Sequence, residues 1–120
     1  MARTWVRERT RLLAPPLFRA EVTSVIRERV YRGEMQADDA GAALIGSFGW
    51  PIAIRDLGDS LQRRAFDIAT QFNRPKAYDG QYLALAELLG CELWTGDRRL
   101  INVVAGKLPW LHWIGDYKPA

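Results

Sequence analysis

Short apolar runs of strand length alternate along this sequence with longer amphipathic segments of helical period, and this alternation constrains the fold most. The apolar runs are Leu12–Phe18, Pro51–Ile54, Cys91–Thr95 and Trp110–Ile114. Strands separated by helices need crossover connections, which favour a mainly parallel sheet between layers of helices. A chain of 120 residues has room for one such unit and not for two. We therefore expect residues 1–120 to form a single α/β domain with three layers, α/β/α.

Five helical segments are expected from apolar residues at three- and four-residue spacing. They run from Arg19 to Tyr31, from Asp38 and Asp39 to Phe48, from Asp59 and Ser60 to Phe72, from about Ala77 to Leu89, and from Arg98 to Val104. Gly33 and Gly90 follow two of them, where glycine commonly ends a helix. Asp59 and Ser60 are predicted to cap the third segment. The packing face of the second is predicted to comprise Ala42, Ala43, Leu44, Ile45 and Phe48.

The composition indicates a soluble cytoplasmic protein. Hydrophobic residues make up 48% of the chain, and the net charge of +3 permits contact with nucleic acid without arguing for it. No apolar run approaches the roughly 18 residues that a membrane-spanning helix needs, and the basic start has no apolar signal region. The single cysteine, Cys91, cannot form an internal disulfide, so we expect it to be buried and reduced.

Three acidic residues occupy positions where a predicted strand leads into a predicted helix, or where a helix begins. Glu21 is expected in the first turn of the first helix, Asp79 in the first turn of the Ala77–Leu89 helix, and Asp97 directly after the Cys91–Thr95 strand. Ligands of open α/β sheets bind at such strand ends. Clustered carboxylates without histidine or cysteine favour Mg²⁺ or Mn²⁺. Taken singly, each acid also has a structural explanation, because a carboxylate near a helix N-terminus stabilises it by about 0.3–1 kcal/mol.

Four segments, in order from about residue 12 to residue 117, carry a resemblance to a known family. They are LAPPLFRAEV at Leu13–Val22, YDGQYLALAE at Tyr78–Glu87, LWTGDRRL at Leu93–Leu100 and GDY at Gly115–Tyr117. Together they resemble the motifs of VapC-type PIN-domain toxins, the ribonucleases of type II toxin–antitoxin pairs. Gly80 stands where these toxins usually have alanine, and we expect the cost of glycine in a first helical turn to be small.

The resemblance implies a function for these motifs. Glu21, Asp79 and Asp97 are similar to three of the four acidic residues that hold the metal in such toxins, and Thr95 to a hydroxyl position that helps to arrange the site. It implies an endoribonuclease that uses Mg²⁺ or Mn²⁺ to hydrolyse RNA phosphodiesters. It also implies a cognate VapB-type antitoxin as partner, and a homodimer formed through the helix that contains Glu21–Tyr31.

The sequence departs from the family at its N-terminus. PIN domains begin with a central strand that ends in an aspartate, followed by a helical hairpin, whereas Met1–Arg11 is similar to the last helix of that hairpin. Glu8 lies on a charged stretch and not at a strand end. We therefore expect the first strand and its aspartate to be missing, most simply because the sequence is a fragment or begins at an internal start.

Other interpretations stay open at this point. A catalytically inactive or truncated PIN protein that binds RNA or protein is the main alternative, and a purely structural domain with a fortuitous acidic edge is a second. Arg98 and Arg99 are candidates either for RNA phosphate or for capping the short helix. His112 lies between two tryptophans and is not expected to act as a base or ligand, and most of the tryptophans, including Trp50, are expected to pack in the core.

Overall fold

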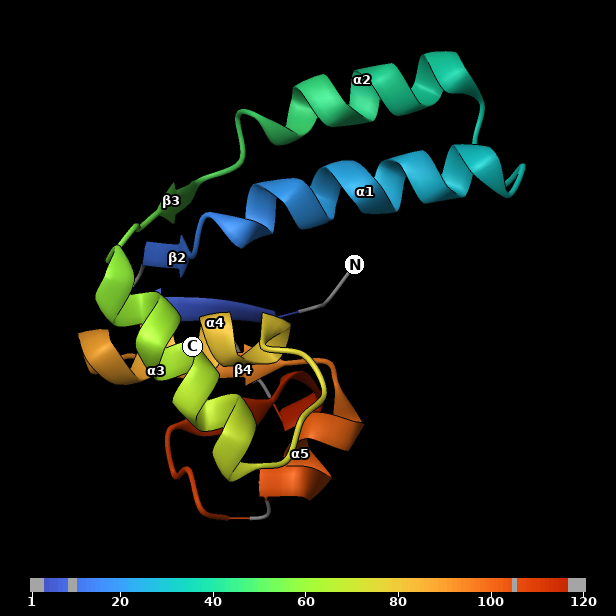
Figure 1. Ribbon diagram of the computed structural model, residues 1–120. Coiled ribbons are helices and arrows are strands. Elements are labelled where there is room, and N and C mark those ends of the chain that lie inside the picture. Colours follow the sequence, from blue (N-terminus) through green and yellow to red (C-terminus); the bar gives the residue numbers. More distant parts are fainter. Residues whose placement is uncertain (1–3, 9–10, 105, 117–120) are drawn as a thin grey trace.

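A single sheet organises the structure, a computed structural model that describes residues 4–8, 11–104 and 106–116 (Figure 1). In these ranges five strands pair in the order β3-β2-β1-β4-β5. They are β1 (Thr4–Glu8), β2 (Arg11–Ala14), β3 (Ile52–Ile54), β4 (Glu92–Thr95) and β5 (Leu111–Trp113). The four apolar runs predicted to be strands are therefore confirmed, each with shorter bounds than the sequence indicated.

The direction of the strands agrees with the prediction of a mainly parallel sheet. β2 pairs parallel with β3, and β4 pairs parallel with β5, whereas β1 is antiparallel to both of its neighbours, β2 and β4. Four of the five described strands consequently point the same way, and their carboxyl ends lie at one edge of the sheet. At that edge the reversed strand β1 begins, with Thr4 opposite Thr95.

The N-terminal stretch corrects a prediction. We expected Met1–Arg11 to resemble the end of a helix, but Thr4–Glu8 forms the central strand. The reason is the pairing itself, because β2 and β4 would otherwise face each other across a gap with unpaired backbone groups. Thr4, Trp5 and Val6 are residue types that suit strands, so local preference and sheet pairing agree here.

All five predicted helices are present in the described residues, together with a short 3₁₀ helix. They are α1 (Leu17–Tyr31), α2 (Ala37–Ser47), α3 (Asp59–Gln71), α4 (Tyr78–Leu89), α5 (Arg98–Val104) and η1 (Ile114–Asp116). The predicted cap of α3 is wrong: Gly58 is the N-cap and its N–H bonds to Asp56 Oδ1 at 2.8 Å. Among the described residues, no helix has both the length and the apolar character required to cross a membrane.

The core lies between one face of the sheet and the helices α3, α4 and α5. From the helices it takes Leu61, Ala65, Ile68, Leu83, Leu85 and Leu100, and from the strands Leu13, Leu93 and Leu111. Cys91 is buried beside them, as predicted. Burial of this apolar surface is the main source of stability for the fold. We refer to the sheet with α3, α4 and α5 as the body.

The helices α1 and α2 form a hairpin that extends from the body, and we refer to it as the arm (Figure 1). In Figure 1 the strands β1, β2 and β3 lie between the arm and the helices of the body, which agrees with an α/β/α arrangement. Among the described residues of the arm helices, only Val22 and Ala40 are buried. The predicted packing face of α2 is wrong, because Ile45 and Phe48 are 68% and 61% exposed.

Candidate metal centre

The three predicted carboxylates come from separate elements at the carboxyl edge of the sheet. Asp97 lies two residues beyond the end of β4, and Asp79 lies in the first turn of α4, as predicted. Glu21 lies on α1, which follows β2. Because α1 begins at Leu17, Glu21 is in the second turn and not in the first, so its carboxylate does not serve the helix N-terminus. The structural explanation considered for Glu21 is thereby removed.

Electrostatics connects these three side chains. Burial is the largest cause that raises the pKa of Asp79, and the charge of Asp97 raises it further. Burial likewise raises the pKa of Glu21, and the charge of Asp79 adds to the increase. Asp79 is therefore close enough to both Glu21 and Asp97 for their negative charges to repel its own. Such a group of carboxylates favours a cation that would reduce this repulsion.

Glu21 is held by a tyrosine of the body. The Tyr82 hydroxyl donates a hydrogen bond to Glu21 Oε1, and the tyrosine is only 3% exposed. Burial raises the pKa of Tyr82, and the bond to Glu21 raises it further, so the phenol keeps its proton and acts as a donor. Tyr82 lies three residues after Asp79 on α4, which places both side chains on the same side of that helix. The phenol thus joins the arm to the body at the acidic centre.

Asp79 is held by an arginine. Arg74 donates from its terminal nitrogen to Asp79 Oδ2 at 3.2 Å, and the two side chains are 27% and 30% exposed. The charge and the hydrogen bond of Arg74 lower the pKa of Asp79, but burial and Asp97 outweigh them, and the net shift is upward.

Asp97 is held by backbone. Its Oδ1 accepts hydrogen bonds from the N–H groups of Arg99 at 2.9 Å and Leu100 at 3.2 Å, so it caps the start of α5. Its own N–H donates to Thr95 Oγ1 at 3.0 Å, and Thr95 is fully buried. Thr95 therefore fixes the turn that presents Asp97, which fits the arranging role expected of this hydroxyl.

Each carboxylate thus has its own partner within the chain, and this shapes what the centre can bind. Among the described residues, no group of three or more histidine, cysteine, aspartate or glutamate side chains is placed to hold a metal ion. The donor chemistry of three carboxylates fits a hard divalent cation, but their present arrangement does not gather them on one point. Movement of at least one side chain would be needed to form a complete ligand set. In the described range of β1, Thr4 is the residue at this edge and Glu8 is the residue at the opposite end of the strand.

Two residues of the centre were not singled out from the sequence. Tyr82 belongs to the YDGQYLALAE motif, and its spacing from Asp79 was the available signal. Arg74 lies outside every motif, five residues before Asp79. Its side chain reaches the centre because of the loop between α3 and α4, which periodicity does not describe.

The other candidates from the sequence lie elsewhere or have structural contacts. The Arg98 guanidinium lies 4.1 Å from the centre of the Trp113 ring, a cation–π contact, and Arg99 is exposed on α5. His112 stacks on Trp94 with ring centres 4.6 Å apart and lies 3.7 Å from Glu92. These contacts give His112 a structural role.

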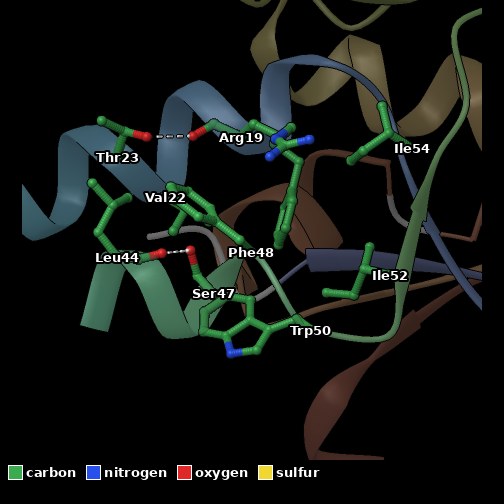
Figure 2. A pocket seen from close by; sticks show the side chains of 10 residues that line it. Arg19, Val22, Thr23, Leu44, Ser47, Phe48, Trp50, Ile52 and Ile54 are labelled. Carbon is green, nitrogen blue, oxygen red and sulfur yellow. Dashed lines mark hydrogen bonds between the residues drawn. The ribbon is translucent and has the colours of Figure 1, made fainter. Parts of the chain in front are cut away.

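A concave feature away from the carboxylates lies where the arm meets β3 (Figure 2). It is a pocket lined by Phe18, Arg19, Val22 and Thr23 of α1, Leu44, Ser47, Phe48 and Trp50 at and after α2, and Ile52 and Ile54 of β3. Arg19 lies 5.9 Å from the centre of the Phe48 ring. Trp50 is 43% exposed here, so its predicted place in the core is wrong.

The fold and the acidic edge define a class of protein, an α/β protein with a carboxylate centre at its strand ends, and relatives define it further. No family model matches the chain. The chain is 31% identical over 104 residues to VapC ribonuclease Mb0985 of Mycobacterium bovis, a match that covers 82% of this chain and 75% of the relative. The same values hold for Ribonuclease VapC9 of Mycobacterium tuberculosis. The chain therefore belongs to the VapC family, and the predicted resemblance to PIN-domain toxins is confirmed.

Proposed function

We propose that this protein is a metal-dependent endoribonuclease toxin of a VapBC-type toxin–antitoxin system. The observation that carries the proposal is the electrostatic coupling of Glu21, Asp79 and Asp97 at one edge of the sheet, in a chain whose relatives are named as VapC ribonucleases. Its substrate is RNA, and its partners are a VapB-type antitoxin and a second copy of the chain. We place it in the cytoplasm.

In this proposal the three carboxylates hold Mg²⁺ or Mn²⁺ through oxygen atoms alone. When bound, such a cation lowers the pKa of a water molecule and stabilises the charge that develops on the phosphate oxygens. The chain's own contribution is position: Thr95 fixes the turn that carries Asp97, and Tyr82 fixes Glu21. We assign Glu21, Asp79 and Asp97 as metal ligands and Thr95 as a positioning residue.

A catalytically inactive PIN protein that binds RNA or protein is a second candidate. The observation that favours it is the lack, among the described residues, of a group of three side chains placed to hold a metal. An inactive protein would retain the fold and the arm, and would bind a partner without hydrolysis.

Cleavage of RNA separates the two candidates. Purified protein is incubated with a mixture of structured RNAs in Mn²⁺, in Mg²⁺ and in chelator, alongside the variants Asp79→Asn and Asp97→Asn. The proposal expects metal-dependent cleavage that both variants lose. Exposed Asp38 on α2 provides a matched control, because Asp38→Asn removes a carboxylate of the arm and should leave cleavage intact. Cleavage unaffected by Asp79→Asn and Asp97→Asn would contradict the assigned site, and no cleavage by the parent protein would favour the inactive candidate.

A further inference from the structure

Arg74 brings a positive charge directly onto a predicted metal ligand. Its guanidinium nitrogen lies 3.2 Å from Asp79 Oδ2, and both side chains are about 70% withdrawn from solvent, with exposures of 27% and 30%. Asp79 is also the middle carboxylate of the centre, because it raises the pKa of Glu21 and its own pKa is raised by Asp97. Arg74 therefore neutralises the carboxylate that repels both of the others.

The backbone of Arg74 is fixed in place by the end of α3. The Arg74 N–H bonds to the Ala69 carbonyl at 2.8 Å, and the Asn73 N–H bonds to the Thr70 carbonyl at 3.1 Å. Asn73 between them has a positive φ of 52°. These features form a Schellman motif, in which asparagine is one of the few residues that tolerates the left-handed conformation. The backbone of Arg74 is thus fixed by the helix end, and its side chain extends from there to Asp79.

A guanidinium and a divalent cation compete for the same carboxylate oxygens. A cation bound to Asp79 would lie close to the Arg74 guanidinium, and the two positive charges would repel each other. Asp79 is thus already paired with a cationic side chain of the protein itself, and among the described residues no group of three is placed for a metal.

We propose that Arg74 is the internal counter-cation of the centre: it neutralises Asp79 in the metal-free protein and leaves that carboxylate when a divalent cation binds. This inference rests on the proposed function, because it concerns the same carboxylates. It assigns a role to a residue outside every motif of the sequence. The consequence is that Arg74 lowers the affinity for the cation while stabilising the protein without it.

A second arginine–carboxylate pair provides a matched control. Arg64 of α3 donates from its terminal nitrogen to Glu87 Oε2 of α4 at 3.0 Å, and the side chains are 35% and 33% exposed. These exposed fractions are close to those of Arg74 and Asp79. The pair links α3 to α4. Glu87 lies eight residues beyond Asp79 on α4, so this pair does not belong to the acidic centre.

The test compares Arg74→Gln, Arg74→Lys and Arg64→Gln with the parent protein. Mn²⁺ binding is measured by titration calorimetry, and thermal unfolding is measured in chelator and in saturating Mn²⁺. Arg74→Gln is expected to bind Mn²⁺ about fivefold to tenfold more tightly, because one nearby positive charge is removed at a partly exposed site. Its melting temperature should fall in chelator and recover in Mn²⁺, since tighter binding stabilises the folded state more. Arg74→Lys retains the charge and should bind Mn²⁺ much as the parent does.

Arg64→Gln should lower the melting temperature equally with and without Mn²⁺ and leave affinity unchanged, as expected of a structural pair. The inference is overturned if the parent binds Mn²⁺ and Arg74→Gln binds it equally or more weakly. Arg74 would then not oppose binding of the cation by Asp79. If none of the four proteins binds Mn²⁺ and the parent cleaves no RNA, the proposed metal dependence fails and displacement of Arg74 fails with it. Binding by Arg74→Gln alone would support the inference most strongly.

Discussion

The body and the arm differ in how many of their apolar side chains are buried. In the body, Leu61, Leu83 and Leu85 are almost fully buried between α3, α4 and the sheet. In the arm, Tyr31, Ile45 and Phe48 are each more than 60% exposed. Buried apolar side chains stabilise a fold, whereas exposed ones leave apolar surface in contact with solvent. The stability of the fold therefore comes mainly from the body, because among the described residues of the arm helices only Val22 and Ala40 are buried.

The candidate centre lies where these two regions meet. Asp79 and Asp97 come from the body, and Glu21 comes from the arm. The hydrogen bond from Tyr82 to Glu21 joins them. The relative position of the carboxylates therefore depends on how the arm is attached to the body.

The largest difference is expected from truncating apolar side chains in each region. Leu85→Ala removes a fully buried side chain of the body and should lower the free energy of unfolding by about 2–5 kcal/mol. Ile45→Ala removes a side chain that is 68% exposed and should change it by about 0.5 kcal/mol or less. Chemical denaturation of the isolated chain measures both. If the two variants lost equal free energy of unfolding, the Ile45 side chain would have to be packed in the isolated protein, and the contrast between body and arm would be wrong.

Glycine-to-alanine substitutions should change stability in opposite directions in the body and in the arm. A Cβ at Gly80 of α4 would lie 2.5 Å from the Ala65 carbonyl oxygen, so α3 and α4 would have to separate. Gly80→Ala should destabilise the protein by about 1–3 kcal/mol despite alanine's better helix propensity. At Gly46 of α2 a Cβ meets nothing within 4 Å, and Gly46→Ala should stabilise by up to about 1 kcal/mol. Thermal unfolding of the two variants measures these stability changes. Stabilisation by Gly80→Ala would contradict the prediction, because it would mean that α3 and α4 can separate without cost.

Gly80 also shows what the sequence does not contain. From the sequence, glycine at position 80 was expected to cost only a small amount of helix propensity. In the structure the backbone of Gly80 lies so close to Ala65 of α3, fifteen residues earlier, that a Cβ would collide with the Ala65 carbonyl. The five helices and the other four strands of the described residues could be predicted, because hydrophobic period is local information, whereas Thr4–Glu8 was wrongly expected to be helical. The contact between helices is not local, and one sequence gives no measure of it.

The same distinction applies to the centre. Glu21, Asp79, Asp97 and Thr95 could be selected because motifs and strand ends locate them in the chain. Arg74 could not, because its position depends on the left-handed turn at Asn73. The strand Thr4–Glu8 was predicted as helix because its charged residues resemble a helical surface, and its pairing with β2 and β4 decided otherwise.

Removal of the phenol hydroxyl should loosen the arm with a moderate effect on overall stability. Tyr82→Phe keeps the buried ring and removes the hydrogen bond to Glu21, and we expect a loss of about 1 kcal/mol. Hydrogen exchange should increase in α1 more than in α3, because the bond ties the arm to the body. Exchange that increases equally in both helices would contradict the division into two regions.

The smallest expected effect is the pH dependence of stability in the metal-free protein. Burial raises the pKa of Glu21 and of Asp79 above their ordinary values, 4.5 and 3.8, so the folded state binds their protons more tightly than the unfolded state does. Ionisation of these two groups therefore opposes folding above their folded-state pKa values, and this opposition disappears as the pH falls towards the ordinary values. The double variant Glu21→Gln/Asp79→Asn should accordingly gain stability relative to the parent at neutral pH, and the gain should shrink in acid. Unfolding in chelator between neutral and mildly acidic pH measures the difference, and a gain that grows as the pH falls would contradict both the sign and the proposed repulsion between arm and body.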